Sequence, residues 1–132
     1  MNVHGETIAE PVEPSTNWAA LTSPSVDLLA HPGLMTPDEA RLASEPGTWV
    51  ETSARRGHSL VNVHVPQLAS AHCAFMILNS DAYEPTDLLT PEMPRKIAAG
   101  AALSNDETRG LFTVNRKPLL EKLGIPFPAI TR

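Results

Sequence analysis

The chain has 132 residues, of which 42% are apolar and 5% aromatic, and its 15 acidic and 10 basic side chains give a formal net charge of −5. This length is that of one domain with a core of ordinary size. Residues 1–46 contain seven acids and one base, which argues against a nucleic-acid-binding arm. No apolar run approaches the roughly 20 residues that cross a bilayer, so we expect neither nucleic acid nor a membrane as a partner.

Cysteine content and the first residues bear on location. The single cysteine, Cys73, excludes an internal disulfide and is typical of a reducing compartment. Residues Met1–Glu6 lack the basic start and apolar stretch of a signal peptide. We therefore expect an intracellular, cytoplasmic protein, or a virion component if the source is viral.

Residues 1–34 have the composition of an extended N-terminal arm. Four prolines recur among Thr, Ser and Glu, a mixture that favours extended backbone. The apolar residues of this stretch follow neither the helical nor the strand period. Apolar residues without a partner in their own domain commonly contact another chain. The candidate partner-binding residues of the arm are Trp18, Leu21, Leu28 and Leu29.

A capping box predicts a helix that begins after Thr36. Thr36 is suited to the N-cap, Pro37 to the first helical position, and Glu39 to the return hydrogen bond of the box. The following segment, Thr48–Ser53, has the composition of a strand.

Two further segments give the strongest strand signals of the chain. Gly57–Val65 alternates between a valine-rich face and a face with histidine and asparagine, and Cys73–Asn79 is apolar on both faces. A strand that is apolar on both faces must be covered on both, so we expect Cys73–Asn79 at the centre of the sheet, with Phe75 buried. Leu60 lies on the otherwise polar face of its strand and joins the candidate partner-binding residues.

The second half of the chain predicts two helices and a short strand. Pro91–Leu103 has apolar residues at helical spacing, Gly110–Val114 has the composition of a strand, and Asn115–Leu123 forms a last helix. The expected fold is α+β: a small, mainly antiparallel sheet of about four strands, with one or two packed helices. The arm (1–34) precedes this core domain (35–125), and a C-terminal tail (126–132) follows it.

The sequence contains few patterns that carry chemistry. A Gly-rich phosphate loop, a Gly-x-Ser-x-Gly elbow and a Cys-x-x-Cys pair are all missing, which argues for a protein that is not an enzyme and needs no cofactor. The low-ranking metal-site candidates are His58, His64 and His72, because a hairpin between the two strong strands brings imidazoles together and imidazoles suit Zn²⁺ or Cu²⁺. The alternative is that exposed strand positions tolerate histidine, since no acid lies in this stretch.

One segment carries a resemblance to a known family. The residues Ala82-Tyr83-Glu84 and the alanine-glycine stretch within Lys96–Ser104, behind a Pro/Thr/Ser-rich arm, resemble the small head-decoration proteins of tailed bacteriophages. This resemblance implies a trimeric structural protein that binds a capsid and has no catalytic residues.

Three functional hypotheses follow. The first is a non-enzymatic subunit of a larger assembly, such as a virion, that attaches through its arm and forms a homo-oligomer, with a trimer favoured. The second is a small histidine-based metal-binding protein or metal-dependent enzyme. The third is an acidic inhibitor or regulator that binds a larger protein.

Overall fold

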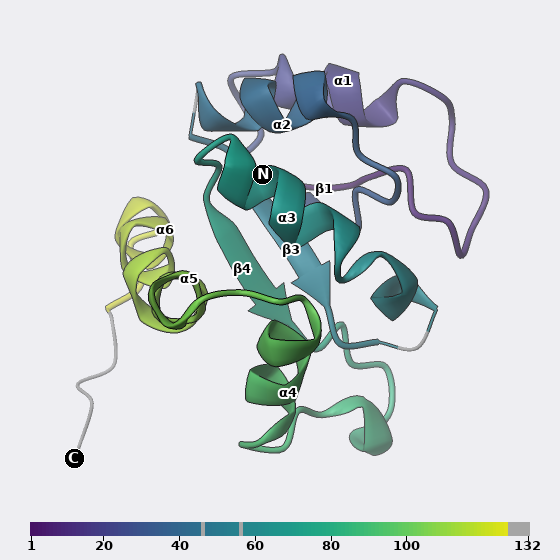
Figure 1. The fold of residues 1–132 in the computed structure, drawn as a ribbon. Coiled ribbons are helices and arrows are strands. Elements are labelled where there is room, and N and C mark those ends of the chain that lie inside the picture. The colour runs from purple at the N-terminus through teal and green to yellow at the C-terminus, as the bar shows by residue number, and fades with distance from the viewer. Residues whose placement is uncertain (46, 56, 127–132) are drawn as a thin grey trace.

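The computed structural model of the protein describes residues 1–45, 47–55 and 57–126. Its centre is a four-stranded sheet with the strand order β1-β2-β3-β4, in which every neighbouring pair is parallel (Figure 1). The strands are β1 (Asn2–His4), β2 (Leu28–Ala30), β3 (Trp49–Ser53) and β4 (Met76–Asn79). Parallel neighbours need a crossover rather than a tight turn, and helical segments supply it between each pair.

The helical segments fall into two groups. The crossovers are α1 (Thr16–Leu21), α2 (Pro37–Ser44), and the pair of the 3₁₀ helix η1 (His58–Val61) with α3 (His64–Ala71). After β4 the chain forms the 3₁₀ helix η2 (Pro85–Asp87), α4 (Met93–Gly100), α5 (Asn105–Arg109), the π-helical turn η3 (Gly110–Val114) and α6 (Arg116–Lys122). In Figure 1, α1 and α2 lie together at one end of the molecule, while α5 and α6 lie beside β4.

The core lies between the two central strands and the crossover helices. Leu29 of β2 and Val50 of β3 are fully buried, and Val65 and Ala69 of α3 belong to the same apolar cluster. Within the described residues, no helix combines the length and apolar character that a membrane span requires.

The prediction of a mainly antiparallel sheet was wrong. Gly57–Val65, expected to be a strand, forms η1 and the start of α3, so β3 and β4 are joined by a helical crossover and run parallel. Alternation placed Val61, Val63 and Val65 on one face, yet Val61 and Val65 are buried while Val63 is 47% exposed. The period that governs burial here is helical, through Val61, Val65 and Ala69 at i, i+4 and i+8.

The structure also corrects the description of residues 1–34 as an extended arm. This stretch contributes β1, α1 and β2, and β1 pairs with β2 in parallel register, with Val3 opposite Leu29. Leu21 and Leu29, expected to contact a partner chain, are 2% and 0% exposed in the chain's own core. The apolar residues of this stretch therefore have partners within the domain, which the lack of a local period concealed.

Several local predictions are confirmed. Helix α2 has the predicted capping box, in which the Thr36 side chain accepts a hydrogen bond from the Glu39 backbone and the Glu39 carboxylate accepts one from the Thr36 backbone. Strand β3 and helices α4 and α6 lie in the expected segments. Gly110–Val114 is a π-helical turn instead of a strand. The predicted tail, residues 126–132, lies outside the described residues except for its first position.

Phe75 is not the buried centre of a strand. It precedes β4, is 40% exposed, and stacks on Trp49 with ring centroids 5.3 Å apart. Cys73, expected at the head of that strand, lies exposed in the turn after α3 with φ of 57°.

We predict that Leu29→Ala lowers the free energy of unfolding by about 3 kcal/mol, because it leaves a cavity at a fully buried position. Phe75→Ala is the matched comparison and should cost about 1 kcal/mol, since its ring is partly in solvent already and loses mainly the stacking on Trp49. Urea denaturation of the two variants measures the difference. Equal losses would contradict this assignment of the core.

Candidate metal centre

Polar side chains from all four strands meet at one edge of the sheet. His4 is the last residue of β1, His31 directly follows β2, and Glu51 is the middle residue of β3. His58 begins η1 after β3, and Asp81 follows β4 by two residues. Because the strands are parallel, their carboxyl ends lie side by side, and this is the edge at which open parallel sheets bind ligands.

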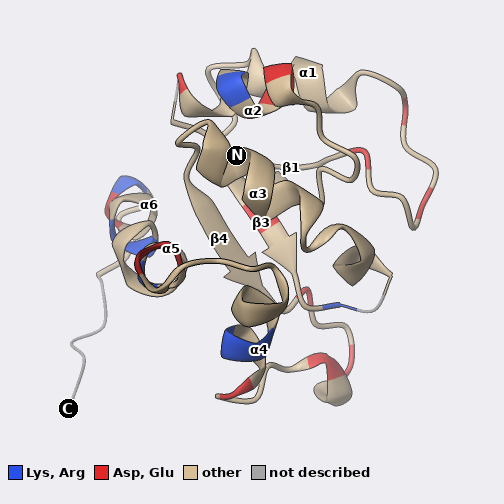
Figure 2. Ribbon diagram, viewed as in Figure 1, with Lys and Arg blue, Asp and Glu red and all other residues tan. Residues whose placement is uncertain are grey.

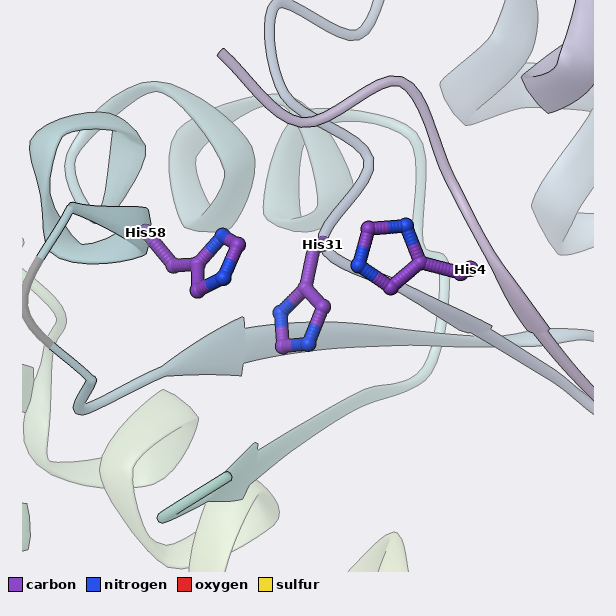
Figure 3. A group of neighbouring side chains, drawn as sticks. All are labelled: His4, His31 and His58. Atoms are coloured by element: carbon purple, nitrogen blue, oxygen red, sulfur yellow. The ribbon is translucent and has the colours of Figure 1, made fainter. Parts of the chain in front are cut away.

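Three of these side chains are histidines whose rings lie together. The rings of His31 and His58 are stacked with centroids 4.1 Å apart, and the ring of His4 meets that of His31 edge-on at 4.9 Å. One ring nitrogen from each histidine lies within 4.8 Å of those of the other two. Figure 3 shows His4 and His58 turned toward His31 from opposite sides.

The ring orientations of His4 and His58 are held by contacts with two residues of the loop after β1. Nδ1 of His58 is 2.7 Å from the hydroxyl of Thr7, and Nδ1 of His4 is 3.1 Å from the Gly5 carbonyl. A carbonyl only accepts, so Nδ1 of His4 donates this hydrogen bond, which leaves Nε2 as the atom that can bind a metal ion. Partners of this kind fix the tautomer and direction of histidines that bind metal ions.

Asp81 joins the cluster from the loop after β4. Its Oδ2 atom is 3.3 Å from Nε2 of His31 and 3.8 Å from Nε2 of His58. The same oxygen is 3.2 Å from the guanidinium of Arg55, which lies over the ring of Tyr83 at 4.1 Å. Two ligands of a tetrahedral zinc ion lie about 3.3 Å apart, so Asp81 is near the separation that shared coordination with His31 requires.

Two buried polar atoms in the centre have no hydrogen-bond partner among the described residues: Nδ1 of His31 and Oε1 of Glu51. The two side chains are 5% and 2% exposed, and their closest approach, from His31 Nδ1 to Glu51 Oε2, is 3.7 Å, which is too long for a hydrogen bond. Buried polar atoms are rarely left unpaired, and ligand sites are among the places where they occur.

Burial also sets the protonation of the centre. Burial, followed by the charge of His58, lowers the pKa of His31 to about 4, and burial lowers the pKa of His58 as well. Burial raises the pKa of Glu51 to about 7, against smaller opposing hydrogen bonds from the Asn79 side chain and the His31 backbone. The His31 and His58 imidazoles are therefore neutral at pH 7, the form in which a ring nitrogen binds a metal ion.

The backbone around the centre is tightly constrained. His31 and Asp81 both have left-handed backbone, with φ of 50° and 48°. Gly33 has φ of 61°, and a Cβ there would overlap the carbonyl of Glu6, so only glycine lets the loop after β1 cross the loop after β2. That crossing brings Thr7 to His58. Strained backbone that the surroundings hold in place is common at functional sites.

A small cavity adjoins the buried part of the centre. Its volume is about 10 Å³, and its lining includes Thr7, His31, Glu51, His58 and Asn62. This is close to the space that one water molecule occupies, and its lining offers several polar partners. The cavity therefore has room for a single water-sized ligand beside His31, Glu51 and His58.

The structure unites only part of the predicted histidine set. His58 belongs to the centre, but Nε2 of His64 is 2.7 Å from the Met35 carbonyl, and His72 lies at the end of α3. The sequence analysis missed His4 and His31. A signal existed for His31, which directly follows the short apolar strand Leu28–Ala30, but not for His4, because Asn2–His4 has a single apolar residue.

The remaining candidates for partner contacts lie outside the centre. Trp18 of α1 is 46% exposed and Leu60 of η1 is 76% exposed, while Leu28 is partly buried in β2.

Comparison with known proteins gives a relative without a described function. A protein of Methanocaldococcus jannaschii, named only as "Uncharacterized protein MJ1295", is 38% identical over 121 residues, which are 92% of this chain and 56% of that protein. The chain thus spans just over half the length of this relative. No protein-family model matches the chain. No solved structure matches it either.

We predict that Glu51→Gln stabilises the metal-free protein at pH 8. Glu51 holds a proton up to about pH 7 when folded, but only to 4.5, its ordinary value, when unfolded. The stability that the protonated Glu51 side chain contributes is therefore fully present below pH 4.5 and is lost as the pH rises through 7. At pH 8 the buried carboxylate costs on the order of 3 kcal/mol, which glutamine avoids.

Thermal unfolding with a chelator at pH 5 and pH 8 measures this effect. The melting temperature of Glu51→Gln should exceed that of the wild type by several degrees at pH 8 and by much less at pH 5. Glu13→Gln, which changes an exposed carboxylate, is the control and should shift neither. A lower melting temperature for Glu51→Gln at pH 8 would show that the carboxylate is stabilising.

Proposed function

We propose that this chain forms the metal centre of a metal-dependent hydrolase, with His4, His31 and His58 as ligands. The observation that carries the proposal is the convergence of three imidazole nitrogens at the carboxyl edge of a parallel sheet. Two of these histidines, His31 and His58, are 6% and 3% exposed, so their placement costs desolvation that a bound cation offsets.

The donor set fits a first-row transition metal ion. Imidazole nitrogen suits Zn²⁺, Fe²⁺, Ni²⁺ and Cu²⁺ better than Mg²⁺ or Ca²⁺, which prefer oxygen. Three histidine ligands leave a further position for water, as in a catalytic zinc site, and Zn²⁺ can expand to five ligands where Asp81 also coordinates; structural zinc sites are closed and four-coordinate. His4 is exposed, so the centre is open on the β1 side.

The surrounding residues have defined parts in this proposal. Thr7 and the Gly5 carbonyl orient two of the rings, and Asp81 is placed to supply a carboxylate oxygen to the ion or to accept a proton from its water. A bound ion of this kind would lower the pKa of a coordinated water molecule toward neutral pH and so supply the nucleophile for hydrolysis. The chain spans only 56% of the length of its relative. Which reaction the whole protein catalyses, and on which substrate, is therefore part of this proposal as well.

We predict that the wild-type chain binds one Zn²⁺ per molecule and that His58→Ala weakens binding at least 100-fold, since it removes a ligand. Thr7→Ala should weaken binding about 10- to 100-fold, because the ring of His58 loses the hydroxyl that orients it. Thr7→Ser keeps a hydroxyl at this position and should bind Zn²⁺ as the wild type does. Isothermal titration calorimetry with metal-free protein measures both effects.

The chain provides its own control for this experiment. It has five histidines, of which His72 is outside the centre and partly exposed. His72→Ala should bind Zn²⁺ as the wild type does. Equal weakening by His72→Ala and His58→Ala would indicate adventitious binding, and a wild-type protein that binds no transition metal would refute the proposal.

Assembly with other protein chains is a second proposal, favoured by the exposure of Trp18 and Leu60. A single exposed apolar side chain is common on protein surfaces. Trp18 and Leu60, however, are the two candidate contact residues whose side chains are exposed instead of packed in the core. We predict that the protein is a trimer by light scattering and that Trp18→Ser with Leu60→Ser makes it monomeric. Val114→Ser, at another exposed apolar position, is the control. A monomeric wild type would contradict self-assembly.

A further inference from the structure

Arg55 already forms an ion pair with the carboxylate of Asp81, which a metal ion at this centre would use as a ligand. Its guanidinium is 3.2 Å from Oδ2 of Asp81, the same oxygen that faces Nε2 of both His31 and His58. The Arg55 and Asp81 side chains are 29% and 20% exposed, so solvent screens their attraction only in part. In the metal-free chain, Arg55 is thus the permanent cation closest to Asp81 among the described residues.

The geometry sets Arg55 and a bound ion in competition. An ion coordinated by the histidines draws on the lone pairs of Oδ2, which the guanidinium already engages as a hydrogen-bond acceptor. A divalent ion and a guanidinium that share one carboxylate oxygen also repel each other at short range. Coordination by Asp81 therefore favours the departure of Arg55.

Tyr83 provides a place to which Arg55 can withdraw. The guanidinium already lies over the Tyr83 ring, 4.1 Å from its centroid, and this ring is 75% exposed. Planar guanidinium groups are stabilised on aromatic faces, and this contact does not depend on Asp81. If Arg55 leaves Asp81, its side chain therefore loses one of its two partners and keeps its contact with Tyr83.

We propose that Arg55 is a displaceable counter-cation of the metal centre: it holds Asp81 in the metal-free protein and yields that carboxylate to the ion when the ion binds. The inference rests on the proposed metal site and adds its regulation by a residue that does not bind the ion. Arg55 is a positioning residue in this scheme, acting through Asp81.

A double-mutant cycle on Zn²⁺ affinity tests the proposal. Arg55→Met should bind Zn²⁺ about five- to tenfold more tightly than the wild type, because the competitor is gone. Asp81→Asn should bind more weakly, since a neutral amide is a poorer ligand. With Asp81→Asn in place, Arg55→Met should change the affinity less than about twofold, because the contact through which Arg55 acts no longer exists.

The cycle separates displacement from the general effect of a positive charge. Loss of a nearby charge alone would raise the affinity equally with Asp81 and with Asn at that position, and such a result would overturn the proposal. Arg109→Met, which removes an exposed arginine of α5 that pairs with Asp106, is the matched control and should leave the affinity unchanged. Arg55→Gln repeats the test should Arg55→Met fail to fold.

The two proposals fail in different ways. A wild-type chain that binds no Zn²⁺ would refute the metal site and, with it, the role of Arg55. A chain that binds Zn²⁺ through His58, and whose affinity is unchanged or lowered by Arg55→Met, would keep the metal site and refute the displacement alone.

Discussion

The parallel pairing of four short strands is the constraint on which the rest of this structure depends. Each strand contributes few residues, and β1 and β2 have only three each, so their direction matters more than their length. With every strand parallel, the residues that end β1 and follow β2 and β4 reach the same edge. In an antiparallel sheet His4 and His31 would lie at opposite ends of their strands. The histidine cluster thus follows from topology, and the crossover helices that enforce the topology are part of the site's construction.

The polar groups at this edge of the sheet destabilise the folded chain, and the apolar core has to compensate for them. Three imidazoles and two carboxylates lie together, and two of the imidazoles and one of the carboxylates are almost fully buried. His31 and Glu51 each have an atom with no hydrogen-bond partner in the part of the chain that the structure describes. Such groups destabilise a folded chain unless a ligand binds them, because burial disfavours both unpaired polar atoms and charge. Burial of Leu29 and Val50 in the central strands provides hydrophobic stabilisation that opposes this effect. An ion that binds only the folded chain offsets this cost, by an amount set by its affinity and concentration.

The sequence predicts the local features of this fold far better than its global ones. The Thr36 capping box is a contact between neighbours, and β3 lies in an isolated strand signal, so both were found. Gly57–Val65 fits the strand period and the helix period equally well, and only the packing of Val61 and Val65 under the sheet decides between them. His58 was identified as a candidate, but with His64 and His72, its neighbours along the chain. Its partners His4 and His31 are 54 and 27 positions away, and no local pattern connects them.

Charge balance links the separate parts of the site. The metal-free centre contains neutral His31 and His58, and the carboxylate of Asp81 is paired with the guanidinium of Arg55. Glu51, whose pKa is raised to about 7, adds part of a negative charge near neutral pH. A divalent ion at this site would repel the guanidinium of Arg55, because the neutral imidazoles have no positive charge to give up. Arg55 is the movable one: its side chain is partly exposed, it is held by a single carboxylate, and it has Tyr83 as a second partner. The rings of His31 and His58, by contrast, are buried and fixed by the loops after β1 and β2. The fold therefore holds two of the proposed ligands in buried positions, and the cation that we propose to be displaced is the more exposed group.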